Sequence, residues 1–419
     1  MREIVVIGGG AGGLAAAIVA KEEGKDVLLI EREETLGGIL NQCIHNGFGL
    51  EVFKEEYTGP EYAYQYIKKI KDLNIDYILD TTVTGIDKNE DIFTISMTSK
   101  SQGITTLEAK AVILTSGCYE RTRGQITMPG DRPRGVFTAG SAQRYLNIDG
   151  YLVGKKVFIL GSGDIGLIMA RRMTLEGAKV LGVAEIMPYS NGLNRNIVQC
   201  LNDFSIPLYL SHTVTKTIAD ENNNLEKIII QKVDETFKPV EGTEKVFEVD
   251  ALLLSIGLIP DITILDNLKI DTDSKTKSAI VNQAYETSVP GLFISGNALQ
   301  VHDLVDNVTK ESQRAAMNAV KYLEKKQDLG KKIRLIAGKN IGYVTPQIID
   351  FSWKEANLIL SFRTTKKIEK AILKVFQNNS VIYEKRMVFL VPAEMETISF
   401  DYLNLNQEED LYMELEELS

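Results

Sequence analysis

EIVVIGGGAGG, residues 3–13, is the stretch from which the rest of the fold can be worked out. Four β-branched residues, 4–7, run into glycines at the spacing GxGxxG, which are Gly8, Gly10 and Gly13, and an alanine-rich helical pattern follows. In a βαβ unit the first glycine permits a tight turn, the second lets the backbone approach a pyrophosphate, and the third lets the helix pack on the strand. The helix amino terminus offers N–H donors to phosphates. The stretch therefore predicts a bound dinucleotide.

A carboxylate follows at the distance that this motif requires. The second expected strand, residues 26–30, ends at Glu31, about twenty residues after the glycines, where an acid binds a ribose hydroxyl. The simpler alternative is a glycine-rich turn in an ordinary βαβ unit, with Glu31 only capping the end of a strand.

The same pattern returns at residues 156–166, KVFILGSGDIG. Gly161, Gly163 and Gly166 have the GxGxxG spacing, a helix is predicted over 167–176, and a strand over 179–183 leads to Glu185. Two such units in one chain predict two dinucleotide sites. Glu185 favours NAD over NADP, because a carboxylate bonds a free ribose 2′-hydroxyl and repels a 2′-phosphate, and no arginine follows it directly.

Composition and charge narrow the class of protein. The chain has 419 residues, of which 44% are hydrophobic and 25% charged, enough for two or three ordinary globular domains. The net charge of -10 argues against nucleic acid or an anionic membrane surface as the main partner. No apolar run approaches ~18 residues, and the first strand begins too close to Met1 for a signal peptide. We therefore expect a cytoplasmic protein without a membrane span.

The three cysteines, Cys43, Cys118 and Cys200, include no CxxC pair, and there are only three histidines. This pattern excludes a disulfide framework, a four-thiolate iron–sulfur site and a structural zinc cluster. We expect Cys118 and Cys200 to be core residues.

Hydrophobic periodicity predicts the remaining elements of the first 330 residues. Helices are expected over 60–74 and 309–327, the second capped by Asp306 or Asn307. Strands are expected at 75–79, 81–86, 93–97, 105–107, 112–114, 206–210, 227–232, 247–254 and 290–294. The strand at 112–114 ends in Thr115-Ser116-Gly117, where the chain can pass close to a ligand, and the strand at 247–254 leads to Gly257, expected beneath the nicotinamide.

From residue 334 onward the pattern changes to short alternating strands. They predict a separate small β domain, a sandwich, with Leu358, Leu360 and Phe362 on its core face and Asn378-Asn379 at a hairpin turn. The acidic tail from residue 407 is expected to be a loose helix or a frayed end.

The order of these parts resembles the two-dinucleotide-binding-domain flavoproteins of the pyridine nucleotide-disulfide oxidoreductase superfamily, over residues 1–328. Six strings are similar to the bacterial FAD/NAD-dependent oxidoreductases encoded beside a glycerol-3-phosphate-oxidase-like flavoprotein and a small cysteine-bearing protein, and to the α subunits of opine, sarcosine and proline dehydrogenases. They are GGILNQCIHNGFGL (37–50), TGPEYA (58–63), EIMPY (185–189), RNIVQCL (195–201), PLYLSHTV (207–214) and GNALQVHDLVD (296–306).

The resemblance implies an α/β fold with two Rossmann-like domains and a C-terminal all-β domain. The FAD-binding domain would comprise residues 1–120 and 259–329, the NAD-binding domain 121–258 and the β domain 330–419. It further implies FAD at the first site and NAD(H) at the second, with hydride passing from nicotinamide C4 to flavin N5.

Residues at matching positions imply the FAD contacts. These are Gly8, Gly10, Ala11, Gly12 and Gly13 at the pyrophosphate, Glu31 and Arg32 at the adenosine ribose, Gly37, Gly38, Ile39 and Gln42 at the ribityl chain and ring, Val83 at the adenine, Thr115, Ser116 and Gly117 at the phosphate side, and Gly296, Asn297 and Asp303 near the ribityl chain and ring. Asn297 replaces the family's aspartate, so this contact is expected to be weaker because an amide carries no charge.

The NAD contacts implied in the same way belong to the second glycine motif and the strand ends beside it. They are Gly161, Ser162, Gly163, Asp164, Ile165, Gly166, Glu185 and Gly257.

Cys43 departs from the disulfide-reductase pattern because it follows the Gly-Gly turn without a partner cysteine. Two uses remain open: a single redox or peroxide-sensing thiol whose pKa is lowered beside His45, or a packed thiol lining the ring pocket. His302 has two uses as well, either a catalytic group near the flavin or a hydrogen bond within its loop.

The leading function is an NADH-linked FAD oxidoreductase subunit that exchanges electrons with a partner protein and has no redox disulfide. The expected partners are a second flavoprotein and a small cysteine-containing protein, within an oligomer or complex. One alternative is a free-standing NADH oxidase or peroxidase that uses Cys43. Another is a flavin-bearing scaffold without catalysis.

Overall fold

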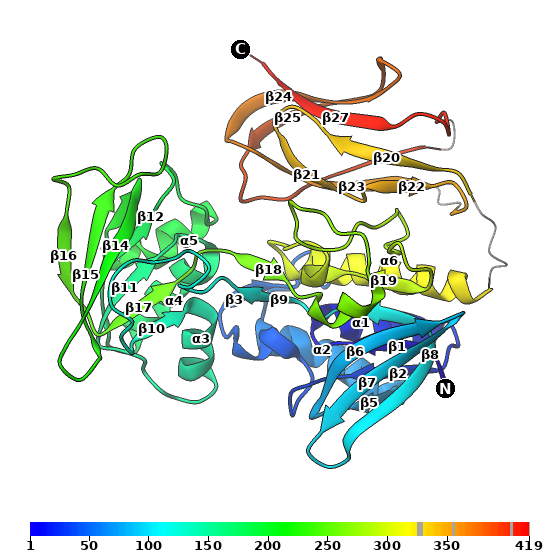
Figure 1. The fold of residues 1–419 in the computed structure, drawn as a ribbon, viewed down its shortest axis with the longest axis horizontal. Coiled ribbons are helices and arrows are strands. Elements are labelled where there is room, and N and C mark those ends of the chain that lie inside the picture. Colours follow the sequence, from blue (N-terminus) through cyan, green and yellow to red (C-terminus); the bar gives the residue numbers. More distant parts are fainter. Residues whose placement is uncertain (325–329, 354–356, 403–404, 419) are drawn as a thin grey trace. The chain divides into compact units, whose positions relative to one another are not determined.

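The computed structural model describes residues 1–324, 330–353, 357–402 and 405–418. The chain divides into two compact units, Met1–Cys118 with Pro260–Ser419, and Tyr119–Ile259. The first contains a mixed sheet with a parallel core and also carries an all-β part near the C-terminus, and the second contains a parallel sheet (Figure 1). β9 (Cys118–Glu120) and β18 (Leu258–Pro260) lie where the chain leaves the first unit and returns to it. The expected α/β fold with a C-terminal β domain is confirmed.

A seven-stranded sheet forms the base of the first unit, in the order β5-β2-β1-β8-β7-β6, with β19 also paired to β8. The strands are β1 (Arg2–Ile7), β2 (Val27–Ile30), β5 (Asp76–Ile78), β6 (Thr81–Asn89), β7 (Ile92–Ser99), β8 (Gly103–Leu114) and β19 (Leu292–Ile294). β2, β1 and β19 pair in parallel with their neighbours. Their unbroken apolar runs are typical of parallel strands covered on both faces.

β8 corrects the expectation of two strands at 105–107 and 112–114, because it runs unbroken over both. Its first half, which pairs with β7 in an antiparallel ladder, alternates between exposed and partly buried residues. Residues 111–114 are all buried because they lie between β1 and β19. The burial pattern therefore changes within β8 because its neighbouring strands change.

Three helices of the first unit are α1 (Ala11–Glu22), α2 (Gly59–Asp72) and α6 (Val305–Glu324). Alanines of α1 and α6 share one core, which lets the two helices approach closely. α2 has the expected extent and begins with a capping box between Thr58 and Glu61. α6 begins one turn earlier than expected, so Asp306 lies in its first turn and accepts the N–H groups of Gly49 (3.2 Å) and Val52 (2.9 Å). The expected end of this helix, at 327, lies outside the described residues.

The second unit contains a five-stranded parallel sheet in the order β10-β17-β11-β12-β13. Its strands are β10 (Val136–Thr138), β11 (Lys156–Leu160), β12 (Lys179–Glu185), β13 (Leu208–Leu210) and β17 (Ala251–Leu254), and its helices are α3 (Ala139–Asn147), α4 (Asp164–Leu175) and α5 (Asn194–Cys200). An antiparallel sheet accompanies it, made of β14 (His212–Ala219), β15 (Leu225–Lys232) and β16 (Lys245–Glu248).

The single strand expected over 247–254 is therefore wrong, because it divides into β16 and β17 in two different sheets. The division falls at Asp250, whose carboxylate accepts the main-chain N–H groups of Lys155 (3.1 Å) and Lys156 (2.8 Å). This side chain fixes the turn between the two sheets.

The C-terminal β domain packs two sheets, β22-β20-β27-β24-β25 and β21-β23-β26. The strands are β20 (Lys332–Ala337), β21 (Ile341–Thr345), β22 (Ile348–Asp350), β23 (Leu358–Thr364), β24 (Ile368–Gln377), β25 (Ser380–Leu390), β26 (Glu396–Phe400) and β27 (Leu411–Glu417). Leu358, Leu360 and Phe362 are fully buried, as expected. β24 and β25 form the expected hairpin at Asn378-Asn379, and both asparagines have positive φ.

The expectation for the acidic tail is wrong. β27 is a central strand that pairs in parallel with β20 and antiparallel with β24. Leu411, Met413 and Leu415 are buried on its inner side. The acidic and polar residues between them occupy the other face, so a period of two was hidden in a segment that looks mainly charged.

Candidate nucleotide-binding sites

The first glycine motif forms a close-packed turn that opens on one side. Gly8 has φ +107°, and a Cβ at Gly13 would lie 1.7 Å from the Gly8 carbonyl oxygen. A Cβ at Gly10, in contrast, would have no heavy atom within 4 Å. Gly8 and Gly13 are therefore required by the turn itself, while Gly10 borders the open space that a pyrophosphate needs.

Thr115 supports this turn from the neighbouring strand β8. Its hydroxyl lies 2.9 Å from the carbonyl oxygen of Ile7 and 3.0 Å from that of Gly8, and it donates to them. The side chain expected at the phosphate side is therefore occupied with the turn. Ser116 likewise donates its hydroxyl to the Asp261 carbonyl (2.5 Å), whereas a Cβ at Gly117 would meet open space.

Glu31 lies at the end of β2, directly against the first turn. Glu31 is 5% exposed, and its carboxylate accepts the N–H groups of Gly9 (2.6 Å) and Glu33 (2.8 Å). The Arg32 side chain is 67% exposed, with Nε 3.9 Å from the Glu33 carboxylate. Of the two residues expected at the adenosine ribose, Glu31 is the one held against the glycine turn.

The 37–42 loop also lies against this turn. Gly37 donates its N–H to the Gly9 carbonyl (2.9 Å), and a Cβ at Gly38 would lie 3.0 Å from the Cα of Gly10. The loop continues as the short helix η1 (Gly38–Gln42), in which Ile39 is exposed and Gln42 buried. The structure therefore brings the 37–42 loop into contact with the first glycine turn, although a helix and a strand lie between them in the sequence. Val83, expected at the adenine, has its side chain packed in the core.

Gly296 and Asn297 begin a loop that several hydrogen bonds hold in place, although the buried Gln300 Oε1 and His302 Nδ1 have no hydrogen-bond partner among the described residues. Gly296 donates its N–H to the Glu311 carboxylate (2.7 Å), and the Asn297 side-chain oxygen accepts the N–H of His302 (3.0 Å). The His302 ring nitrogen Nε2 lies 3.1 Å from the Glu311 carboxylate, and both side chains are 3% exposed. This geometry supports the loop hydrogen bond for His302 rather than a catalytic role.

Asp303, expected near the flavin, is bonded to residues of the β domain. Its carboxylate pairs with Arg363 of the β domain at 2.5 Å and accepts the N–H of Met395 at 2.7 Å. Sequence analysis missed both Arg363 and Glu311, because neither belongs to a motif and the partners of Arg363 come together only when the β domain folds.

Cys43 does not have the environment of a reactive thiol. Burial raises the pKa of the Cys43 thiol from its ordinary value of 9.0 to about 12, which is opposite to the lowered pKa that the sensing role needs. The centroid of the His45 ring lies 5.0 Å from the centroid of the Phe48 ring. Cys200 is buried, and Cys118 is half-buried with its sulfur 3.7 Å from the Asn297 amide nitrogen.

The second glycine motif repeats the construction of the first. Gly161 has φ +97°, and a Cβ there would lie 2.0 Å from the Ser255 carbonyl oxygen. Gly166 donates its N–H to the Ser255 hydroxyl at 3.1 Å. Ser255 follows β17 as Thr115 follows β8, so it supports the second turn as Thr115 supports the first. Sequence analysis missed Ser255, although the segment Ser255-Ile256-Gly257 parallels Thr115-Ser116-Gly117 and could have indicated it.

Glu185 holds the second turn as Glu31 holds the first. It is 3% exposed, and one carboxylate oxygen accepts both the N–H (2.9 Å) and the hydroxyl (2.7 Å) of Ser162. Asp164 instead faces the 193–196 segment, where it accepts the Leu193 N–H at 2.8 Å and the Asn196 side-chain amide at 2.6 Å.

The remaining expected NAD contacts have different surroundings. Ile165 packs against the core of this unit. A Cβ at Gly163 would be 3.4 Å from the Ser255 hydroxyl, an ordinary contact, and Gly257 has φ +105°.

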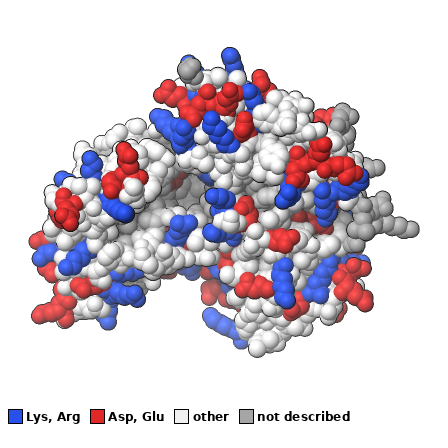
Figure 2. Space-filling model, turned by 45° about the horizontal axis from the view of Figure 1, so that its top comes forward, with Lys and Arg blue, Asp and Glu red and all other residues white. Residues whose placement is uncertain are grey.

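The described residues show no sign of a further kind of ligand, such as a metal ion. Acidic and basic side chains are interspersed over the face shown in Figure 2. Among the described residues, no group of three or more His, Cys, Asp or Glu side chains is arranged to hold a metal, and no helix is long and apolar enough to cross a bilayer.

Comparison with known proteins agrees with the two-site architecture. The family model for pyridine nucleotide-disulphide oxidoreductases matches residues 2–314. A dihydrolipoyl dehydrogenase of Mycoplasma pneumoniae is 25% identical over 66% of this chain, a match that spans 55% of that protein. A thioredoxin reductase of Listeria monocytogenes is 24% identical over 77% of this chain and 94% of its own length.

Among solved structures, the thioredoxin reductase of T. acidophilum has the same fold over 77% of this chain and 99% of its own, with a TM-score of 0.62 and 22% identity. The family match ends inside α6, so the C-terminal β domain lies beyond it. Two glycine turns, each held by a buried carboxylate, together with a match over most of the chain, lead to one assignment. The chain belongs to the pyridine nucleotide-disulphide oxidoreductase family, whose members bind FAD and NAD(P)H.

Proposed function

We propose that this protein is an NADH-linked FAD oxidoreductase that exchanges electrons with a partner protein and uses no redox disulfide. The observation that carries the proposal is the pair of matching glycine turns, each closed by a buried glutamate, Glu31 and Glu185. The absence of a CxxC pair and the raised pKa of Cys43 support a route that bypasses thiols.

FAD bound at the first turn supplies the hydride acceptor, and the chain supplies binding and orientation. The N–H groups at the start of α1, together with the open side of Gly10, provide the pyrophosphate site. Glu31 accepts one hydrogen bond at each carboxylate oxygen from the main chain, and each oxygen keeps a lone pair for a ribose hydroxyl.

Glu185 favours NADH over NADPH as the nicotinamide substrate. Its negative charge lies beside the second turn, where a 2′-phosphate of NADPH would have to bind, and like charges at this distance repel. We expect the second cofactor to be discriminated mainly at this residue.

The test is an anaerobic titration of the purified yellow protein with NADH and, separately, with NADPH, followed by the flavin absorbance. NADH should bleach the flavin at lower concentration than NADPH. A flavin that neither nucleotide bleaches would favour the non-catalytic scaffold. An equal response to both would refute the role of Glu185.

The partner proposal rests on the family resemblance of the six sequence strings and on the lack of a thiol pair. We propose that electrons pass to or from a second flavoprotein and a small cysteine-containing protein within a complex. Co-purification of the tagged chain with these two proteins tests it. A reduced flavin that reacts rapidly with oxygen or peroxide in the isolated chain would support the oxidase alternative instead.

A further inference from the structure

We infer that Arg363, in the C-terminal β domain, is a positioning residue for FAD. It lies on β23, beyond the part of the chain that matches the family, and it holds the loop that carries the flavin-binding Gly296 and Asn297. The inference rests on the proposed assignment of that loop to the flavin.

All five N–H donors of the Arg363 guanidinium have an acceptor, which is the full capacity of this group. One terminal nitrogen donates to the Val301 carbonyl (2.9 Å) and the Asp303 carboxylate (2.5 Å). The other donates to the carbonyls of Pro392 and Ala393, and Nε donates to the Tyr343 hydroxyl (3.2 Å). Only 16% of the side chain is exposed. A side chain satisfied this completely fixes the groups around it.

The segment from Val301 to Asp303 is therefore gripped from the β domain at three points. Besides the two bonds from Arg363, the second carboxylate oxygen of Asp303 accepts the N–H of Met395 at 2.7 Å. Burial raises the pKa of Tyr343, so its hydroxyl remains neutral and can accept from Arg363.

A few hydrogen bonds connect the Val301–Asp303 segment to the residues expected to bind the flavin. His302, between the two gripped residues, donates its N–H to the Asn297 side-chain oxygen at 3.0 Å. Glu311 accepts from Gly296 N–H at 2.7 Å and from the Gln300 amide at 2.7 Å. The Asn297 side-chain oxygen is thus committed within the loop, which fixes the direction of its amide N–H donors. One of those donors is directed to the Cys118 sulfur at 3.7 Å, and the other is the group expected to bind the ribityl hydroxyls.

Loss of Arg363 should therefore change the binding of FAD. It would leave the Asp303 carboxylate partly buried without its cation, an unfavourable state that the loop can relieve only by moving. At metal sites, removal of a residue that orients a direct ligand commonly costs on the order of tenfold or more in metal affinity, and we expect a similar factor here. We expect Arg363→Met to weaken FAD binding by about this factor and to shift the visible spectrum and midpoint potential of the remaining bound flavin.

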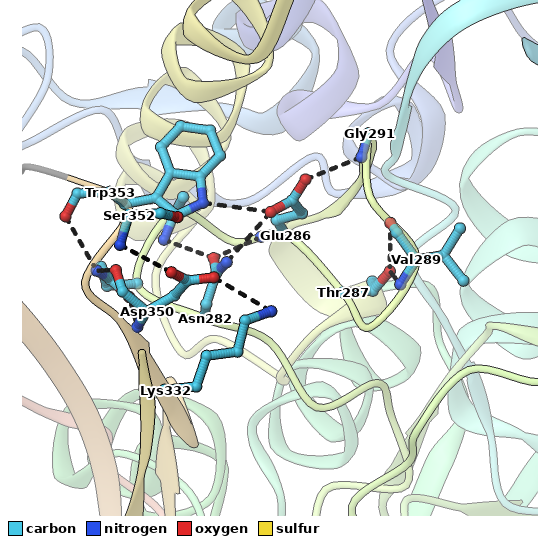
Figure 3. Close-up of polar contacts among 11 residues, drawn as sticks. Asn282, Glu286, Thr287, Val289, Gly291, Lys332, Asp350, Ser352 and Trp353 are labelled. Atoms are coloured by element: carbon cyan, nitrogen blue, oxygen red, sulfur yellow. Dashed lines mark hydrogen bonds and ion pairs between the residues drawn. The ribbon is translucent and has the colours of Figure 1, made fainter. Parts of the chain in front are cut away.

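Two control variants separate this effect from a general loss of the β domain. Arg334→Met removes another Arg–Asp pair of the same domain, with Asp410 at 2.8 Å, whose arginine side chain is 70% exposed. Trp353→Phe removes the indole bond to Glu286 (3.2 Å), part of a buried cluster that joins the β domain to the segment before β19 (Figure 3). Both should leave FAD affinity and the flavin spectrum close to those of the unchanged protein.

The experiment measures FAD affinity of the full-length apoprotein by flavin fluorescence, the spectrum and potential of the bound flavin, and thermal unfolding of each apoprotein. Arg363→Lys serves as a second variant, since lysine keeps the charge but has three donors instead of five. It should give an intermediate affinity. Asp303→Asn in the Arg363→Met background should recover part of the loss, because the unpaired charge is gone.

The outcomes are distinct. If Arg363→Met and Arg363→Lys both bind FAD as tightly as the unchanged protein while Asn297→Ala binds weakly, the inference is wrong and the flavin assignment stands. If Asn297→Ala also binds normally, the assignment of the loop fails. If Trp353→Phe weakens FAD as much as Arg363→Met does, the effect belongs to domain docking in general, and the specific role of Arg363 is refuted.

Discussion

Buried glutamates explain how a chain with net negative charge can hold two anionic cofactors. Glu31 and Glu185 accept main-chain N–H groups from the glycine turns, and in doing so they fix the turns. N–H groups at the amino terminus of a helix that follows such a turn can bind phosphate oxygens without a cationic side chain. The same carboxylate therefore stabilises the turn, and we propose that it also recognises the ribose.

The glycines of the first turn differ in what a side chain would meet, and this gives opposite expectations for two variants. Gly10→Ala adds a methyl group in open space, so apoprotein stability should change by about 0.5 kcal/mol or less, while FAD affinity falls because the methyl occupies the pyrophosphate approach. Gly13→Ala places Cβ 1.7 Å from the Gly8 oxygen, which should cost the apoprotein roughly 2 kcal/mol or more.

Denaturant unfolding of the apoproteins and FAD titration check both variants. A Gly10→Ala protein that binds FAD normally would contradict the assignment of this turn to the pyrophosphate.

The thiol of Cys43 predicts a pH effect on stability. Its pKa is raised by burial to about 12 in the folded state, whereas the unfolded thiol ionises near 9, so between these values the unfolded state binds fewer protons. Stability should therefore fall as pH rises above about 9, by up to about 1.4 kcal/mol per pH unit from this group. Cys43→Ser should remove this part of the slope. Unfolding of both apoproteins from pH 8 to 11 measures it, and parallel curves would contradict the raised pKa.

Hydrophobic periodicity predicts a strand or helix correctly when the same face of that element is buried along its whole length. α2 and the β24–β25 hairpin could be located well, because each has a cap or turn residue at its end. β8, β16 and β17 could not be separated correctly. Residues 103–114 pass from an antiparallel to a parallel pairing within one sheet, whereas residues 247–254 pass from one sheet to another. β27 was missed because charge on its outer face masks the alternation of its apolar residues.

β27 predicts a contrast between its two faces. Leu415 is fully buried between the sheets of the β domain, whereas the Tyr412 residue is 50% exposed. Leu415→Ala should lower the free energy of unfolding by about 2–5 kcal/mol through the cavity it leaves. Tyr412→Ala, on the same strand, should cost about 1 kcal/mol or less. Denaturant unfolding of the apoproteins compares them, and equal losses would mean that the tail is not a core strand.

At the scale of the whole molecule, the sequence locates the two turns but not the groups that support them. Gly8 to Gly13 and Gly161 to Gly166 form motifs because their spacing is local. Thr115, Ser255 and Arg363 reach their partners from strands far away in the sequence, and no local pattern records such contacts. Gly13 and Gly166 lie in different compact units, and we propose FAD for the first and NADH for the second.

This division makes the two half-sites separable by mutation. A Cβ at Gly166 would lie 2.7 Å from the Ser255 Cβ and 2.8 Å from the Gly161 oxygen, all within the second unit. Gly166→Ala should therefore give a yellow protein that dithionite reduces normally but that NADH reduces more slowly, on the order of a hundredfold if the bound nucleotide is displaced by about 1 Å. Gly124→Ala is the matched control, because its Cβ would meet only the Thr122 hydroxyl at 3.8 Å. Anaerobic stopped-flow absorbance distinguishes the variants, and unchanged bleaching of Gly166→Ala by NADH would mean that the nucleotide does not bind at the second turn.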